Sequence, residues 1–230
     1  MKTCILIPCY RHGKALGAVL ERLRAFSLPV IVIDDGCTGE DREALLKAVA
    51  TFTGSVTLCT HENNQGKGAA LITGFRKALS LGFTHALQVD ADGQHDPSYI
   101  APMVENMVST GADIVIGSRF LTEKKHLSAR MTGSALIQFM VRLTTGRKLS
   151  DPTSGMRLYG KGMIERFARE SDFGPEPDTV AYLIRQGAKV SEVQVSMRDR
   201  TAGESYLSFT KSISYMLRTC ISILFVQWFR

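Results

Sequence analysis

The sequence lacks several features that define whole classes of protein. None of its apolar runs reaches the roughly 18 residues that a membrane-spanning helix needs, so no transmembrane helix is expected. The first eight residues end in a proline too early to form the apolar core of a signal peptide. Linkers rich in Gly, Pro or Ser, low-complexity tracts and internal repeats are also missing. We therefore expect a cytoplasmic globular protein of one domain or two small ones.

Cysteine is scarce and shows no paired spacing. The five cysteines are odd in number, scattered, and form no Cys-x-x-Cys pair. This pattern fits a reducing compartment better than a disulfide framework or a zinc site. The net charge of +6 is a modest excess that favours anionic partners such as nucleotides or phospholipids. Because basic residues are not interleaved with aromatic ones in a patch, nucleic acid is not an expected partner.

The common nucleotide-binding and hydrolytic motifs are also missing. The segment Asn64-Gln-Gly-Lys-Gly68 suggests a P-loop, but His61 stands where its first glycine belongs and Gly68 where Ser or Thr belongs. A dinucleotide fingerprint fails there too, because Leu71 replaces its third small residue. We find no Gly-x-Ser-x-Gly elbow, His-Glu-x-x-His zinc motif or calcium loop. The absence of a Gly-rich loop after the first strand also disfavours a nucleotidyltransferase.

Short β-rich runs alternate with helical patterns over the first 117 residues. Strand-like runs cover residues 3–8, 29–34, 56–60, 85–90 and 113–117, and helical patterns cover residues 14–26, 40–52, 68–81 and 97–109. This alternation predicts an α/β fold, a doubly wound, mainly parallel sheet with helices on both faces. The second half is less regular, with helices expected at 127–145, 160–169, 176–186 and 207–230, and strands at 155–159 and 189–197.

Polar side chains collect where the predicted strands end. Asp35, Asp90, Asp92 and Arg119 all follow such ends, and ligands of doubly wound sheets bind at that edge. With the strand extended to residue 90, Asp90 and Asp92 are expected to share one face, since residues i and i+2 of a strand do. Two hard oxygen ligands suit Mg²⁺ or Mn²⁺ held jointly with a phosphorylated substrate. A solvated acidic turn is the alternative, and the convergence on one edge disfavours it.

Seven ordered motifs resemble those of the family 2 glycosyltransferases of GT-A fold, closest to the polyprenyl-phosphate (dolichol-phosphate) sugar transferases. The resemblance spans nearly the whole chain. The motifs are Ile7-Pro-Cys-Tyr10, Ile33-Asp-Asp-Gly36, Asn63-x-x-Gly-Lys-Gly68, Asp90-Ala-Asp-Gly-Gln-His-Asp-Pro97, Gly117-Ser-Arg-Phe120, Asp151-Pro-Thr-Ser-Gly-Met-Arg157 and Arg198-Asp-Arg-Thr-Ala-Gly-Glu-Ser205.

The resemblance implies a metal-dependent, inverting enzyme with a nucleotide-sugar donor. The implied nucleotide-binding residues are Pro8, Tyr10, Asp35, Lys67, Asp90 and Ala91. The implied ligands of Mg²⁺ or Mn²⁺ are Asp90, Asp92 and Gln94, with Asp92 also catalytic. The metal would act as a Lewis acid on the departing nucleotide diphosphate. Arg11-His12 and Cys37 depart from the family pattern beside the expected base pocket, so the resemblance does not identify the base. UDP is the interpretation we prefer over GDP or dTDP.

On the acceptor side, the resemblance implies a polyprenyl phosphate. Arg119, Arg130, Ser134 and Arg200 are the implied phosphate-binding residues, and the arginine fork suits phosphate. Arg119 is also an implied catalytic residue. A lipid phosphate is already anionic near neutral pH, so positioning and charge stabilisation would carry the catalysis. A saccharide hydroxyl acceptor would instead need a general base, for which Asp178 is the candidate.

The C-terminal segment carries apolar residues at three- and four-residue steps opposite a polar stripe, which predicts an amphipathic helix. We expect a catalytic domain over residues 1–206, divided near 117 into nucleotide- and acceptor-binding halves, and a helix over 207–230. That helix is expected to lie in the inner membrane interface, or to dock on a small membrane partner or a second copy. Packing on the enzyme's own core is the alternative. A non-catalytic nucleotide- or lipid-binding module is the remaining rival function.

Overall fold

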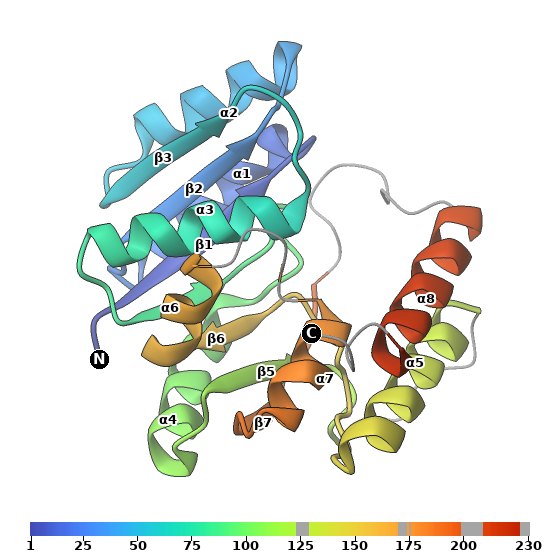
Figure 1. Ribbon diagram of the computed structural model, residues 1–230. Coiled ribbons are helices and arrows are strands. Elements are labelled where there is room, and N and C mark those ends of the chain that lie inside the picture. Colours follow the sequence, from blue (N-terminus) through green and yellow to red (C-terminus); the bar gives the residue numbers. More distant parts are fainter. Residues whose placement is uncertain (123–128, 170–173, 175, 199–208, 226–230) are drawn as a thin grey trace.

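One mixed sheet with helices on both faces forms the protein (Figure 1). The computed structural model describes residues 1–122, 129–169, 174, 176–198 and 209–225, apart from the side chains of 129–132, 209–213 and 215. The strands are β1 (Thr3–Cys9), β2 (Val30–Asp35), β3 (Val56–His61), β4 (His85–Gln88), β5 (Ile114–Ser118), β6 (Arg157–Tyr159) and β7 (Val190–Gln194). The helices are α1 (Gly13–Arg24), α2 (Gly39–Thr51), α3 (Lys67–Ser80), the 3₁₀ turn η1 (Pro97–Tyr99), α4 (Ile100–Thr110), α5 (Ala129–Thr145), α6 (Lys161–Arg169), α7 (Pro177–Arg185) and α8 (Phe209–Leu224).

The strand order is β3-β2-β1-β4-β6-β5-β7. All pairs are parallel except those of β6, which runs antiparallel to β4 and to β5. The predicted α/β class with a mainly parallel sheet is therefore confirmed. The insertion of β6 between β4 and β5 brings the loop that precedes it, residues 151–156, to the same edge as the acidic turn after β4.

Side-chain alternation along the strands builds a core on each face of the sheet. In β1, Cys4 and Leu6 join a cluster with α3, α5, α6, α7 and α8. Ile5 and Ile7 join the opposite cluster, with α1, α2 and α4. The period of two thus covers both faces, as a parallel sheet requires. Gly13 lets α1 approach α2, because a Cβ there would lie 1.9 Å from the Asp41 carbonyl oxygen.

The C-terminal helix α8 is partly a core element. Cys220 and Ile223 are buried, and Met216 occupies the space next to Gly133 of α5. Figure 1 shows α5 and α8 side by side at one end of the molecule, beyond the edge to which β1 and β2 point. One face of α8 therefore packs on the protein itself, which was the alternative to a purely interfacial helix. Among the described helices, none is long and apolar enough to cross a membrane.

Candidate active site

The acidic motif forms a turn beyond the sheet. Strand β4 ends at Gln88, so the expectation that Asp90 and Asp92 share a strand face is wrong. A turn with Gly93 at φ +80° brings the motif together instead, and the Asp92 carboxylate accepts the Gln94 backbone N–H at 3.0 Å. Asp92 is 8% exposed. The turn and its neighbours, and not a strand, therefore set the positions of the two acids.

Asp90 holds its charge although it is half-buried. The Lys67 ammonium lies 2.6 Å from its Oδ1, and the Gln88 amide nitrogen lies 3.5 Å from the same oxygen. Burial tends to raise the pKa of Asp90, but the charge of Lys67 and the hydrogen bonds from Lys67 and Gln88 outweigh it and leave the pKa well below its usual value. The carboxylate is therefore ionised and faces a cation.

His95 was not among the predicted site residues, and its place inside the acidic motif was the only signal for it. Its ring is 5% exposed, and Nδ1 accepts the Asp90 backbone N–H at 2.9 Å. Burial lowers the pKa of His95, with Asp90 opposing that shift. A neutral ring that accepts through Nδ1 carries its hydrogen on Nε2, which lies 4.0 Å from Asp90 Oδ2. His95 thus fixes both the backbone and the surroundings of Asp90.

Two arginines hold the same turn from other elements. Arg22 of α1 donates to the Gly93 carbonyl at 3.0 Å. Arg198, just after β7, pairs with Asp96 at 2.7 Å, and its backbone N–H donates to the Gln94 carbonyl. The acidic turn is therefore braced by α1 and by the segment that follows β7.

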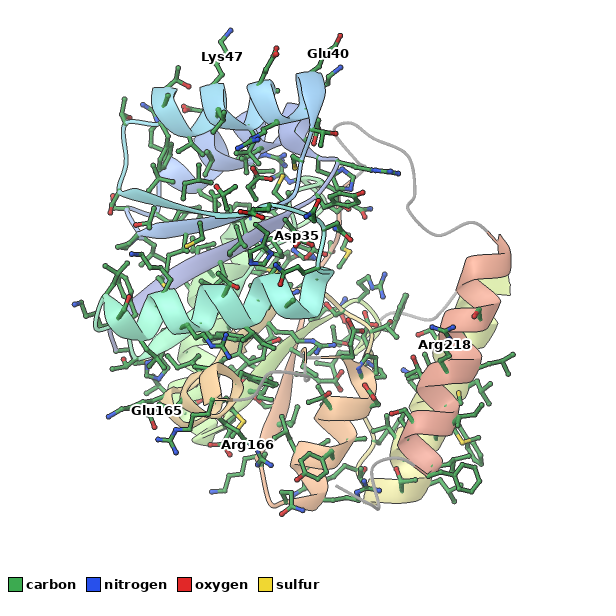
Figure 2. The ribbon with its side chains drawn as sticks, turned by 45° about the horizontal axis from the view of Figure 1, so that its top comes forward. Asp35, Glu40, Lys47, Glu165, Arg166 and Arg218 are labelled. Atoms are coloured by element: carbon green, nitrogen blue, oxygen red, sulfur yellow. The ribbon has the colours of Figure 1, made fainter. Side chains whose placement is uncertain are left out.

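Asp35 is the centre of a clamp on the loop before α3. Its two oxygens accept from the Gln65 and Gly66 backbone N–H groups, both at 2.9 Å, and from the Asn64 amide at 2.9 Å. The His61 ring lies 2.7 Å away. The carboxylate is 2% exposed and lies at the middle of the molecule (Figure 2). Its predicted nucleotide contact remains a prediction, while its protein contacts fix the approach of α3 to Asp90.

The predicted base pocket lies where β1 ends. Pro8 is paired with Ile33 of β2, and Tyr10 follows the strand directly. Arg11 adopts a left-handed backbone at φ +58°, and its guanidinium lies 5.1 Å from the Tyr10 ring centroid. A non-glycine residue in this conformation is uncommon and concentrates at functional sites. This residue departs from the family pattern and sits beside the expected pocket.

Arg119 makes an unexpected buried ion pair. Its Nε and Nη2 donate to the two oxygens of Asp151 at 2.6 and 2.9 Å, and Nη2 also lies 3.3 Å from the Thr153 hydroxyl. Asp151 is fully buried, and the Glu192 carboxylate accepts its backbone N–H at 2.9 Å. The predicted phosphate-binding arginine is thus engaged by a carboxylate, and the pair fixes the loop that leads to Gly155.

The other residues predicted for the acceptor side lie on α5, on α7 or outside the described residues. Ser134 is 9% exposed on α5. Arg130 belongs to the first turn of α5, where side chains are not described, and Arg200 lies outside the described residues. The Asp178 carboxylate accepts the Ser222 hydroxyl at 2.6 Å and so joins α7 to α8. The candidate general base therefore has a structural contact in the acceptor half.

The side-chain oxygens of the acidic turn are suitable ligands for a divalent cation that also binds a diphosphate. Asp90, Asp92 and Gln94 offer only oxygen among their side-chain acceptors, which suits Mg²⁺ or Mn²⁺. The ammonium already lying on Asp90 Oδ1 shows that this oxygen favours a positive charge. In the described part of the chain, no three His, Cys, Asp or Glu residues form a metal cage. Such a site matches the way Mg²⁺ is held by one or two carboxylates and substrate phosphates.

The sheet order, the acidic turn and the clamped loop define a glycosyltransferase of GT-A fold. Residues 4–167 match the family described as Glycosyl transferase family 2, and the chain belongs to this family. The undecaprenyl-phosphate mannosyltransferase of Micrococcus luteus is 30% identical over 221 residues, covering 90% of this chain and 88% of that protein. The UDP-N-acetylglucosamine–dolichyl-phosphate N-acetylglucosaminyltransferase of Methanococcus voltae is 28% identical over 177 residues, covering 70% of each.

Solved structures share the fold at low sequence identity. The mannosyltransferase PcManGT from Pyrobaculum calidifontis, in complex with GDP-Man and Mn²⁺, superposes with a TM-score of 0.67 at 16% identity and covers 96% of this chain and 63% of that one. Glucosyl-3-phosphoglycerate synthase from Mycobacterium tuberculosis, in complex with Mn²⁺, UDP and glucosyl-3-phosphoglycerate, has a TM-score of 0.64 at 16% identity and covers 98% of this chain and 79% of that one. At this low sequence identity, the similarity to these structures establishes a shared fold and nothing about activity.

Proposed function

We propose that this glycosyltransferase moves a single sugar from a nucleotide sugar, UDP-linked in our interpretation, to a polyprenyl phosphate with inversion at the anomeric carbon. The observation that carries the proposal is the ionised Asp90 of the acidic turn, beside the clamped loop before α3, in a chain with relatives named as polyprenyl-phosphate sugar transferases. The proposed division is a nucleotide-binding half up to about residue 117 and an acceptor-binding half after it.

In this proposal Asp90, Asp92 and Gln94 hold Mg²⁺ or Mn²⁺. When bound, the ion offsets the charge of the leaving nucleotide diphosphate. Pro8, Tyr10, Asp35, Lys67 and Ala91 form the nucleotide site, Asp35 chiefly by fixing the loop before α3. Turnover then depends on how accurately the turn holds its carboxylates, since positioning supplies a large share of such catalysis.

Arg130, Ser134 and Arg200 are the proposed acceptor-phosphate residues, and Arg119 fixes the loop over residues 151–156 through Asp151. A phosphate acceptor is anionic and needs no base, so Asp178 has the role of joining α7 to α8. The saccharide-acceptor alternative predicts that Asp178→Asn is the severe change. The phosphate proposal predicts that Arg130→Ala and Arg200→Ala are the severe ones.

A donor and acceptor panel tests the proposal. The protein is incubated with UDP-, GDP- and dTDP-sugars, Mn²⁺ or Mg²⁺, and undecaprenyl phosphate, and a glycolipid is sought by mass spectrometry. A glycolipid that requires the metal supports the proposal. Product on a soluble sugar alone would reject the lipid acceptor, and nucleotide binding without any product would favour the non-catalytic module.

Gly155→Ala tests the geometry of the acidic turn. A Cβ at this position would lie 2.4 Å from Asp90 Oδ2, so the carboxylate must shift. We expect kcat to fall about 100-fold, the typical effect of a displacement near 1 Å, with little change in Tm. Gly162→Ala is the matched control, because a Cβ there meets nothing within 4 Å. Equal kcat values for Gly155→Ala and Gly162→Ala would show that the position of the Asp90 carboxylate next to Gly155 does not affect catalysis.

We also propose that the paired helices α5 and α8 rest on the cytoplasmic face of an anionic membrane. The proposed contact face consists of exposed apolar side chains: Leu136, Phe139 and Leu143 on α5, Leu217 and Ile221 on α8, and Phe225 directly after α8. The sequence segments around the two helices, residues 124–150 and 205–230, contain nine of the 28 Lys and Arg and none of the 22 Asp and Glu. The rest of the chain, with 19 basic and 22 acidic residues, is therefore acidic. Apolar exposure joined to local positive charge favours anionic lipid.

Phe139→Ser with Ile221→Ser and Phe225→Ser should lower binding to vesicles containing anionic lipid about 100-fold, at about 1 kcal/mol for each half-exposed side chain. Sedimentation with vesicles measures it. Val108→Ser is the control, since Val108 is 68% exposed on α4. Deletion of residues 207–230 is a poor test, because it uncovers the core around Ile223. Unaltered sedimentation of the triple variant would show that this face does not bind lipid.

A further inference from the structure

Lys67 links the donor loop to the acidic turn. It is the first residue of α3, and its Nζ lies 2.6 Å from Asp90 Oδ1, with side chains that are 42% and 27% exposed. Ion pairs that reach solvent are weak, because both partners are also well hydrated when separated. The contact can therefore be exchanged for another partner.

Gly155 and His95 also lie close to the Asp90 carboxylate. A Cβ at Gly155 would be 2.4 Å from Oδ2 and 3.2 Å from Oδ1, and His95 Nε2 lies 4.0 Å from Oδ2. Oδ1 is the oxygen that Lys67 contacts, so a cation that binds Oδ1 competes with the ammonium. An ammonium and a divalent cation on the same oxygen repel each other, so a metal that binds Oδ1 weakens the Lys67 contact.

The clamp keeps Lys67 near any ligand of this site. Asp35 fixes the Gln65 and Gly66 backbone N–H groups just before Lys67, so only the lysine side chain needs to move. The N-terminus of α3 adds partial positive charge beside it. A diphosphate there offers the ammonium an anionic partner in place of Asp90.

We propose that Lys67 exchanges partners during donor binding: it neutralises Asp90 first, and passes to the nucleotide diphosphate when a divalent cation binds Asp90. This inference rests on the proposed function. It makes metal and nucleotide binding mutually reinforcing, because each removes an obstacle to the other. By linkage, the nucleotide must tighten metal binding by the same factor as the metal tightens nucleotide binding.

Mn²⁺ binding, read from the electron paramagnetic resonance signal of the free ion, tests the exchange without turnover. Wild-type protein is titrated alone and with UDP or GDP, and nucleotide should tighten Mn²⁺ binding at least tenfold. Lys67→Met should bind Mn²⁺ alone about fivefold more tightly, because its competitor is gone, and should lose most of the tightening by nucleotide. Lys77→Met, in the last turn of the same helix, should match the wild type in both measurements.

The outcomes separate the two proposals. If Lys67→Met binds Mn²⁺ alone no more tightly than the wild type, or keeps the full effect of nucleotide, the exchange is rejected while the metal site stands. If the wild type binds Mn²⁺ neither alone nor with any nucleotide, the proposed function itself is rejected. Circular dichroism of each variant establishes that the fold is retained.

Discussion

Asp92→Asn is expected to lower kcat about 1000-fold with the fold intact. The substitution removes one carboxylate charge from the proposed metal site, and a loss of about 4 kcal/mol of charge stabilisation corresponds to three factors of ten in rate. The fold should survive, because asparagine keeps an oxygen that can accept the Gln94 N–H. Glycolipid formation measured at saturating donor, over a range of metal concentrations, gives both kcat and the apparent metal affinity.

Glu105→Gln is the matched control for this change. It also replaces a carboxylate by an amide, but on the exposed surface of α4, and should leave both values unchanged. If Asp92→Asn keeps more than a tenth of the wild-type kcat, the acidic turn is not the metal site. An equal loss of kcat in Glu105→Gln would show that the net charge of the protein, and not the acidic turn, causes the effect.

Asp151→Ala is expected to cost the largest share of stability. Breaking a buried ion pair typically costs 3–5 kcal/mol, and the Arg119 side chain, 27% exposed, can recover some hydration. We therefore expect about 3 kcal/mol, or roughly 6–12 °C in Tm for a chain of this length. Thermal unfolding followed by circular dichroism measures it. Asp151→Asn, which retains an acceptor oxygen, should fall between this variant and the wild type.

An exposed ion pair provides the comparison. Glu40 pairs with Lys14 at 2.7 Å, but the side chains are 83% and 61% exposed, and Figure 2 shows Glu40 at the outer tip of α2. Glu40→Gln should leave Tm unchanged within error, because solvent screens such a pair. If Asp151→Ala also left Tm unchanged, the pair between Arg119 and Asp151 would contribute no more than an exposed ion pair. Other contacts would then have to hold the loop at Gly155.

Secondary structure followed closely from local patterns. The strand expected at residues 3–8 is β1 (Thr3–Cys9), and the helix expected at 14–26 is α1 (Gly13–Arg24). Such elements depend on side-chain periods of two and 3.6 and on nearby turn residues, all of which lie within a short window. The predicted end of β4 was two residues too late, since an apolar run does not show where pairing with neighbouring strands stops.

The long-range contacts that organise the site could not be predicted from local sequence patterns. Arg119 pairs with Asp151 across 32 residues, Lys67 with Asp90 across 23, and Asp178 with Ser222 across 44. Each partner lies on a different element, and the antiparallel insertion of β6 decides which loops meet at the edge of the sheet. Arg119, expected at the acceptor phosphate, and Lys67, expected at the nucleotide, both have carboxylate partners in the structure.

The sequence by itself determined the α/β class, the position of the acidic motif and the family resemblance, because motif order and periodicity are properties of the chain read locally. Only the tertiary structure decided how the motif is built: a turn braced by His95 and Arg22, with Lys67 on one oxygen of Asp90 and Gly155 against the other. It also decided that α8 buries one face on α5 and α7 and leaves the other exposed. The physical reason is that charge pairing and burial depend on which distant segments the fold brings within a few ångströms, and periodicity carries no record of that.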